Sequence, residues 1–309
     1  MLLPLKKSIN QKVIYTPQGC EPIQLWIKRE DLLHPDISGN KYRKLRYNVE
    51  RAATLGYDTL LTFGGAYSNH IAAAAAAGKE LGFKTIGVIR GDELEKMENV
   101  WTENPTLAFA RSQGMRFKFV SRSDYRLKES DDFIQNLKHE FGDFYLVPQG
   151  GTNEWAVKGC EEILSDEDDT FDFITCAMGT GGTISGIINA AKNHQKVLGF
   201  PALKDDFLGE EILKYVNKTE NWELIKDYHF GGFAKINEEL VRFINDFKNQ
   251  TGVALDPIYT GKMLFGIVDL IQKNYFPKEA RILAIHTGGL QGILGMNYRL
   301  SKQKLNQLV

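Results

Sequence analysis

Short apolar runs rich in β-forming residues alternate with stretches of helical character along the chain, and this alternation constrains the fold more than any other feature. Such an order is typical of α/β proteins, in which mainly parallel strands are covered by helices. We expect strands at Gln24–Lys28, Thr59–Phe63, Thr85–Ile89, Phe117–Val120, Phe144–Val147, Phe173–Cys176 and Ile282–Ile285. We expect helices at Lys41–Thr54, Asn69–Leu81, Thr106–Gln113, Trp155–Leu164, Ile184–His194, Asn237–Gln250 and Lys262–Lys273. The predicted fold class is therefore α/β with open, twisted sheets of parallel type.

The glycines and proline of Pro148–Gly151 end one strand before a new helix and mark the best candidate for a domain boundary. A length of 309 residues also allows about two domains. We therefore predict a smaller α/β domain at residues 45–150, inserted into a larger domain made of residues 1–44 and 151–309.

Composition excludes several classes of function. The chain is 43% hydrophobic and 25% charged with a formal net charge of -1, so it has no basic excess to bind nucleic acid or an anionic membrane. The three cysteines form no Cys-x-x-Cys pair, and the six histidines show no His-Glu-x-x-His spacing. A disulfide framework and a metal site are therefore not expected.

The chain also lacks the patterns of secretion and membrane insertion. Met1–Lys7 contains no apolar signal-peptide core, and the apolar run Ile71–Ala77 is far shorter than the ~20 residues that span a bilayer. We therefore expect a soluble, cytoplasmic protein.

Three glycine-bearing segments stand where predicted strands end and helices begin, which is where ligands bind in open α/β sheets. In the first, Ser38 and Asn40 are good N-cap residues, so Lys41 should lie in the first turn of a helix. The helix dipole there disfavours an ammonium and favours the neutral amine that attacks aldehydes. Taken alone, the segment fits an exposed lysine better, since most lysines are exposed.

The second segment, Gly64–His70, follows a strand and offers Ser68, Asn69 and free backbone N–H groups to a carboxylate at a helix start. An ordinary turn capped by Ser68 explains it equally well in isolation. In the third segment, Met178–Gly186, successive N–H groups aimed from a helix start suit a phosphate. Ile184 replaces the last glycine of a dinucleotide fingerprint, and no Gly-Lys-Ser/Thr follows. A phosphate cup is favoured over a plain glycine turn.

Together the three segments supply an amine, a carboxylate site and a phosphate cup without a metal or nucleotide motif. A pyridoxal-phosphate enzyme requires this combination.

The chain resembles a known family of pyridoxal-phosphate enzymes, which comprises 1-aminocyclopropane-1-carboxylate deaminase and D-cysteine desulfhydrase and has the tryptophan-synthase-β-like fold. The motifs that carry the resemblance are Ile27–Asp31, Ser38–Lys41, Ser68–His70, Gly179–Thr183, Asp256–Lys262 and His286–Gly289. The resemblance implies pyridoxal 5'-phosphate as cofactor, a small amino acid as substrate and a homodimer.

The resemblance also implies roles for individual residues. Lys41 corresponds to the lysine that forms a Schiff base with the cofactor, and Asn69 to a residue that contacts its phenolic oxygen. Ser68, Asn69 and His70 should surround the substrate carboxylate and the scissile region, and Ser68 and Tyr259 should orient the substrate or move protons as catalytic residues. The phosphate should be bound by Gly179, Thr180, Gly181, Gly182 and Thr183.

Two threonines favour one activity within this family. The cyclopropane deaminase pattern has a glutamate at the position of Thr260 and a leucine at that of Thr287, whereas two threonines resemble the desulfhydrase pattern. A carboxylate would keep the cofactor's pyridine nitrogen protonated, while a threonine hydroxyl suits an unprotonated ring, which suffices when a good leaving group departs. We therefore expect a D-cysteine desulfhydrase.

Three alternatives stay open: a cyclopropane-carboxylate deaminase, an enzyme acting on another small amino acid such as a serine dehydratase or racemase, and a non-catalytic ligand-binding relative. Tyr67 and the pair Ile71-Ala72 depart from the family pattern around Ser-Asn-His, where glutamine and a threonine–arginine pair are usual. Tyr67 either narrows the pocket or turns away from it.

Overall fold

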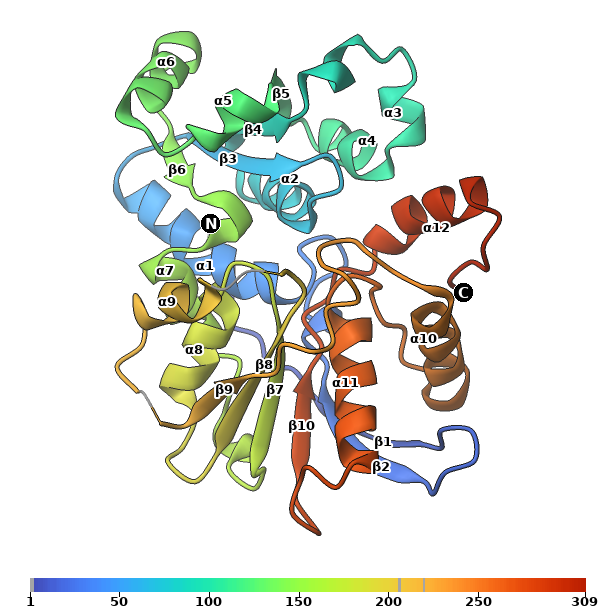
Figure 1. Ribbon diagram of the computed structural model, residues 1–309. Helices are drawn as coiled ribbons and strands as arrows, with labels where there is room; N and C mark the ends of the chain where they lie inside the picture. The colour runs from blue at the N-terminus through green and yellow to red at the C-terminus, as the bar shows by residue number, and fades with distance from the viewer. Residues whose placement is uncertain (1–2, 205–206, 219) are drawn as a thin grey trace.

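A computed structural model describes residues 3–204, 207–218 and 220–309, so the first two residues of Met1–Lys7 lie outside the described part. The chain forms two sheets, one above the other in Figure 1, with helices on their faces. The six-stranded sheet has the order β1-β2-β10-β7-β8-β9 and the four-stranded sheet the order β5-β4-β3-β6. The strands are β1 Asn10–Tyr15, β2 Ile23–Lys28, β3 Thr59–Gly65, β4 Lys84–Arg90, β5 Arg116–Val120, β6 Tyr145–Val147, β7 Phe173–Met178, β8 Lys196–Pro201, β9 Trp222–Leu224 and β10 Ile282–Ile285.

All strand pairs are parallel except β1 with β2. The predicted α/β class with mainly parallel sheets is therefore confirmed. The four-stranded sheet takes its strands from residues 59–147, whereas the strands of the six-stranded sheet come from both sides of that stretch. Helix α1 runs without a break past residue 44, and the predicted domain boundaries stay a prediction.

Side chains alternate between the two faces of the four-stranded sheet, as the period of a strand requires. Leu60 packs with helices α1, α2 and α4, while Leu61 and Phe63 pack on the opposite face. The six-stranded sheet likewise has an apolar core on each face, one beneath α10 and α11 and the other beneath α7 and α8. Burial on both faces explains the continuous apolar runs that predicted these strands.

All seven predicted helices are present. The α-helices are α1 Asn40–Thr54, α2 Asn69–Leu81, α3 Val100–Glu103, α4 Pro105–Ser112, α5 Arg122–Arg126, α6 Asp131–Phe141, α7 Glu154–Glu161, α8 Gly182–Ala190, α9 Leu208–Leu213, α10 Glu238–Thr251, α11 Thr260–Gln272 and α12 Gly292–Lys302. Short 3-10 helices are Glu30–Leu32, Asp92–Lys96, Gln149–Gly151 and Asp166–Asp168. The predicted end of α8 at His194 was wrong, because the extended backbone of Ala191 stops the helix.

Of the strands and α-helices that the prediction missed in the described residues, five have identifiable reasons. Strand β8 contains Gly199 and ends in Pro201, both of which disfavour a strand, and β9 is only three residues long. Strand β1 is rich in polar residues, and α12 begins with a glycine, a poor helix former. Helix α6 carries the capping signal of Ser130 but has few buried residues.

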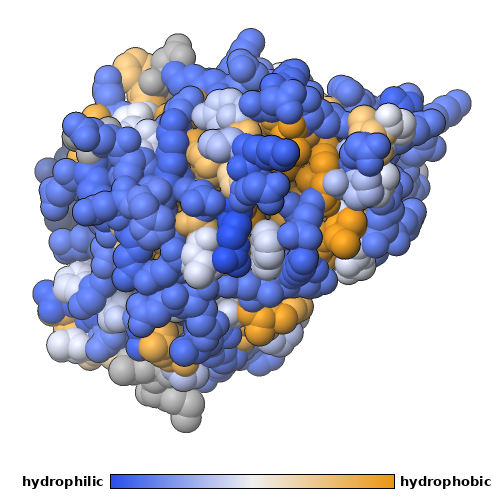
Figure 2. Space-filling view, turned by 90° about the horizontal axis from the view of Figure 1, so that it is seen from below, coloured by the Kyte–Doolittle hydropathy of each residue, from blue (hydrophilic) through white to orange (hydrophobic). Residues whose placement is uncertain are grey.

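The surface is predominantly polar. Figure 2 shows the face at the bottom of Figure 1, which is mostly hydrophilic with a band of hydrophobic groups. Within the described ranges, none of the helices combines the length and the apolar character needed to span a membrane.

Candidate active site

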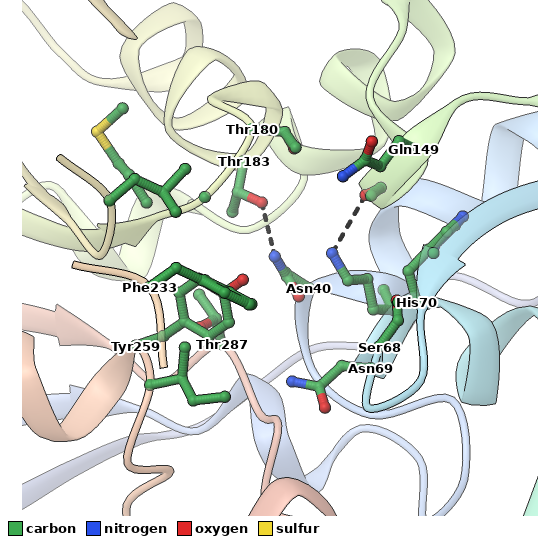
Figure 3. Close-up of a pocket in the computed structure, with 18 of the residues that line it drawn as sticks. Asn40, Ser68, Asn69, His70, Gln149, Thr180, Thr183, Phe233, Tyr259 and Thr287 are labelled. Atoms are coloured by element: carbon green, nitrogen blue, oxygen red, sulfur yellow. Dashed lines mark hydrogen bonds between the residues drawn. The ribbon is translucent and has the colours of Figure 1, made fainter. Parts of the chain in front are cut away.

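A cavity of about 450 Å³ brings the three glycine-bearing segments together, although they are far apart in the sequence (Figure 3). The predicted site residues on its lining are Lys41, Ser68, Asn69, His70, Gly179, Thr180, Gly181, Thr183, Tyr259 and Thr287. Gly182 and Thr260 are not on the lining. Thr260 is fully buried behind it.

The start of helix α1 is fixed by a close approach between two backbone segments. Gly39 is the N-cap residue, with φ at 61°, and a Cβ there would lie 2.0 Å from the carbonyl oxygen of Thr287. The same carbonyl accepts a hydrogen bond of 3.2 Å from the backbone N–H of Asn40. Gly39, and neither Ser38 nor Asn40, therefore caps the helix, because only glycine fits this contact and this φ. Lys41 still lies in the first turn, as predicted.

The amine of Lys41 points into the cavity from this first turn. Its Nζ donates to the carbonyl oxygen of Gly150 at 3.1 Å. Burial lowers the pKa of Lys41 well below its ordinary value, and the nearby ammonium of Lys44 lowers it further. A larger fraction of the neutral, nucleophilic amine is therefore present at neutral pH than for an exposed lysine.

Lys44 is a second buried amine that the sequence reasoning missed. Its Nζ donates to the same carbonyl of Gly150 at 3.1 Å and to Oγ1 of Thr152 at 2.9 Å. It also lies 3.2 Å from the point where a Cβ on Gly182 would sit, so the ammonium stands beside the third glycine segment. The spacing of three residues from Lys41, which places both side chains on one helix face, could have revealed it.

The third segment forms the start of helix α8. Gly181 is the N-cap residue with φ at 82°, and no side chain caps the helix. The first N–H groups of α8 thus have no intrahelical acceptor, and the ammonium of Lys44 lies next to them. Thr183 at this end accepts a hydrogen bond of 2.7 Å from the side-chain amide of Asn40. Asn40 also lines the cavity and was not predicted as a site residue. These groups fit a phosphate.

The second segment starts helix α2. The hydroxyl of Ser68 accepts a hydrogen bond of 3.3 Å from the N–H of Ile71 and caps the helix. Within the described part of the chain, no acceptor takes the hydroxyl proton of Ser68, and the amide of Asn69 has no hydrogen-bond partner. Both groups are half-buried on the cavity wall, where they can bind a polar ligand.

His70 cannot act as a donor on this wall while it is neutral. The hydroxyl of Thr62 donates to the carbonyl of Val147 at 2.8 Å, so Nε2 of His70 must donate to Thr62 at 2.8 Å. Burial, with the ammonium groups of Lys41 and Lys44, lowers the pKa of His70 well below its ordinary value. The neutral ring has no second N–H to offer to a carboxylate. Of the three predicted residues, only Ser68 and Asn69 can therefore donate a hydrogen bond to the substrate carboxylate.

Tyr259 reaches the cavity from the start of helix α11. Its pKa is raised by burial and by the carboxylate of Asp256, so the phenol is protonated at neutral pH. It is therefore a proton donor in its resting state. Among the described residues, no hydrogen-bond partner occupies its hydroxyl.

The two threonines differ in their surroundings. Oγ1 of Thr260 donates to the carboxylate of Asp256 at 2.8 Å and accepts from the N–H of the same residue at 2.9 Å. Its hydroxyl is therefore committed to holding the turn that starts α11. Thr287 lies on the cavity wall and is the threonine available to a bound ligand.

Two aromatic side chains complete the mouth of the cavity. Tyr67 lines it while packing on α12, where a Cβ on Gly295 would lie 2.7 Å from the ring. The ring of Phe233 lies with its centroid 6.3 Å from that of Tyr259. Tyr67 thus lies on the lining with its ring against α12, and we still expect it to affect the size of the pocket. Phe233 gave no sequence signal, because it belongs to an irregular segment.

The motif Ile27–Asp31 forms a buried base below these segments. Lys28 pairs with Asp168 at 2.7 Å, and Glu30 pairs with Arg43 of helix α1 at 2.8 Å. Removing one partner of a buried pair leaves an uncompensated charge, so the Glu30–Arg43 pair holds α1 against the motif, and the Lys28–Asp168 pair joins β2 to the 3-10 helix Asp166–Asp168.

Comparisons with known proteins agree with this geometry. The model of the family described as "Pyridoxal-phosphate dependent enzyme" matches residues 14–288. A protein of Pyrococcus horikoshii named "Putative 1-aminocyclopropane-1-carboxylate deaminase" is 32% identical over 286 residues, which cover 87% of this chain and 85% of that protein. The Arabidopsis thaliana "Bifunctional D-cysteine desulfhydrase/1-aminocyclopropane-1-carboxylate deaminase, mitochondrial" is 33% identical, covering 90% of this chain and 74% of the relative.

The similarity extends to solved structures. The crystal structure of a protein described as the "ACC deaminase homologue" matches with a TM-score of 0.79 and 28% identity. The match covers 98% of this chain and 94% of that one, so the two proteins share the whole architecture.

Proposed function

The chain belongs to the pyridoxal-phosphate-dependent enzyme family, within the group of 1-aminocyclopropane-1-carboxylate deaminases and D-cysteine desulfhydrases, and from this premise we propose that it is a D-cysteine desulfhydrase. The proposed reaction converts D-cysteine and water into pyruvate, hydrogen sulfide and ammonia. The observation that carries the choice of activity is the cavity wall at Thr287: it presents a hydroxyl, and no carboxylate lies on the described lining.

The residues present fit the cofactor. Lys41 would hold it covalently, while Lys44 and the start of α8 would bind its phosphate. When bound, pyridoxal phosphate supplies an aldehyde that joins the substrate amine and a ring that withdraws electrons from the substrate Cα. Thr287 would face this ring without donating a full proton to it, which suits departure of a good leaving group such as a thiol.

The remaining steps fall to side chains of the chain itself. Ser68 and Asn69, at the positive end of α2, would bind the substrate carboxylate. Lys41, released as a neutral amine, would take the proton from Cα. Tyr259, protonated at rest, would deliver a proton to the departing sulfur.

A second candidate is 1-aminocyclopropane-1-carboxylate deaminase, which would release 2-oxobutanoate and ammonia. The name of the Pyrococcus horikoshii relative supports it, as does the double name of the Arabidopsis thaliana relative.

The test compares wild type with Lys41→Ala, and uses Lys79→Ala on the exposed face of α2 as a control. Wild type and the control should show the visible absorbance of lysine-bound pyridoxal phosphate and release sulfide from D-cysteine. Lys41→Ala should lose both, with a fall in kcat of about 10³-fold or more. Release of 2-oxobutanoate from the cyclopropane substrate without sulfide from D-cysteine would favour the second candidate. A wild type that binds no pyridoxal phosphate would refute both.

A further inference from the structure

The irregular segment of residues 229–235, between β9 and α10, carries Phe233 to the mouth of the cavity. Its backbone is unusual, because Phe230 has φ at 53° and Ala234 has φ at 54°, with Gly231 and Gly232 also positive. Left-handed φ costs a residue with a side chain about 1–2 kcal/mol. Such a conformation persists only where its surroundings hold it.

A buried lysine of helix α11 holds this segment. Nζ of Lys262 donates to the carbonyl oxygen of His229 at 2.9 Å and to that of Gly232 at 2.8 Å. Lys262 is only 2% exposed, and burial lowers its pKa to about 8, so the side chain is mostly an ammonium at neutral pH. An ammonium makes stronger hydrogen bonds to carbonyls than a neutral donor does. Arg299 adds an exposed bond of 3.0 Å to the carbonyl of Ala234.

The segment places an apolar ring where the chemistry is expected. Phe233 is 50% exposed, although a phenyl ring gains by burial, and its ring lies at 61° to that of Tyr259. Figure 3 shows the two rings side by side at one end of the cavity. Tyr259 is the residue just before α11, and Lys262 is one turn further along. The start of this helix therefore provides both the phenol and the lysine that holds the segment of Phe233 beside it.

We propose that Lys262 is a positioning residue that holds the segment 229–235 over the cavity, and that Phe233, placed in this way, is a determinant of substrate binding beside Tyr259. This inference rests on the proposed function for its substrate. Phe233 offers no hydrogen-bonding group, so it would pack on the carbon and sulfur atoms of the substrate and keep water from the phenol. A substrate with a thiol or methylene at Cβ suits such a wall better than one with a charged group.

The first arm of the test measures hydrogen–deuterium exchange of cofactor-free protein. Lys262→Met should speed exchange in the amides of residues 229–235 by about tenfold or more, because the segment loses both bonds. Lys262→Arg should restore much of the protection. Lys273→Met, at the C-cap of the same helix and largely exposed, is the matched control and should leave the segment unchanged. Equal exchange in Lys262→Met and wild type would overturn the role of Lys262.

The second arm measures steady-state kinetics on D-cysteine. Phe233→Ala should raise KM about tenfold with a smaller change in kcat, as expected for losing an aromatic contact and part of its burial. Lys262→Met should show the same pattern. The double variant should be no worse than either single one, because Lys262 acts through Phe233. Additive effects, or an unchanged KM in Phe233→Ala, would overturn the proposal.

The two arms separate this inference from the proposed function. If wild type turns over only the cyclopropane substrate, the desulfhydrase assignment fails and the same KM comparison is made on that substrate. If wild type turns over neither, the exchange arm alone decides the role of Lys262 and the substrate role of Phe233 is refuted. If Lys262→Met does not fold, Lys262→Arg and Lys262→Gln take its place in both arms, with Gln expected to expose the segment.

Discussion

The two walls of the cavity are built in different ways. The wall on the six-stranded sheet is fixed by backbone: Gly39 touches Thr287 through main-chain atoms, and the start of α8 presents bare N–H groups. The wall on the four-stranded sheet presents side chains, namely Ser68, Asn69 and Tyr67, on a helix start. We expect few residues of the first wall to tolerate substitution, because its contacts involve the backbone. Side chains of the second wall can be exchanged while the backbone keeps its position.

The two walls differ in what they recognise: we expect the first to bind the cofactor and side chains around the cavity to bind the substrate. Backbone N–H groups and a fixed lysine recognise a phosphate and an aldehyde whatever the substrate is. We expect side chains of the second wall, together with Thr287 and Phe233 across the cavity, to select among amino acids, and here Tyr67 stands where the family pattern has glutamine. Cofactor and fold are thus common to the family, while substrate choice is individual.

The largest expected effect comes from the backbone wall. Gly39→Ala would place a Cβ 2.0 Å from the carbonyl oxygen of Thr287 in a backbone region reserved for glycine, so α1 or the segment after β10 must move. We expect a loss of about 3 kcal/mol or more in the free energy of unfolding, measured by urea denaturation of the cofactor-free protein. Binding of pyridoxal phosphate, followed by absorbance, should weaken in parallel.

Gly56→Ala is the matched control, because this glycine follows the same helix, has φ at 78° and has no atom within 4 Å of the added Cβ. It should cost only about 1–2 kcal/mol and leave cofactor binding intact. Equal losses in the two variants would mean that the contact with Thr287 does not matter and that the two walls are less different than we infer.

A smaller effect, confined to activity, is expected on the side-chain wall. Ser68→Ala should lower kcat on D-cysteine by about 10²-fold, because it removes a hydroxyl from the proposed site. The same change removes a helix cap, which costs about 1 kcal/mol of stability.

Ser130→Ala separates the loss of a helix cap from the loss of a hydroxyl in the cavity. Ser130 caps α6 with a hydrogen bond of 3.4 Å to the N–H of Phe133 but lies outside the cavity. It should lose similar stability in thermal unfolding and no activity. If Ser68→Ala keeps wild-type kcat, Ser68 only caps its helix and the second wall loses its proposed role.

The same contrast explains how much could be predicted from the sequence. Glycines at predicted helix starts reveal parts of the backbone wall, since Gly39 stands two residues before Lys41 and the glycines at 179, 181 and 182 are close together in another segment. The family resemblance adds Tyr259. These predictions needed no knowledge of distant contacts.

Most of the features that were missed depend on contacts in the folded chain that no sequence pattern announces. The donor role of His70 is set by Thr62 and Val147, which no local pattern connects to it. Thr260 turned out to be committed to Asp256, so two threonines that look equivalent in the sequence differ in access to the cavity. Phe233 lies in a segment without helical or strand periodicity, and only the contact between folded segments brings it to Tyr259.

The smallest expected effect concerns the protonation of Lys41 on the backbone wall. Burial, and then the ammonium of Lys44, lowers the pKa of Lys41, so its neutral amine prevails at lower pH than that of exposed Lys79. Each unit of lowering raises the neutral fraction about tenfold below the pKa. Reductive methylation of cofactor-free protein, quantified at each lysine by mass spectrometry across pH, should therefore reach its midpoint at Lys41 first. In Lys44→Met this midpoint should rise, because the repulsion between the two cations is gone, yet stay below that of Lys79 because burial is the larger cause. If Lys41 and Lys79 reach their midpoints at the same pH in both proteins, the surroundings of Lys41 do not lower its pKa.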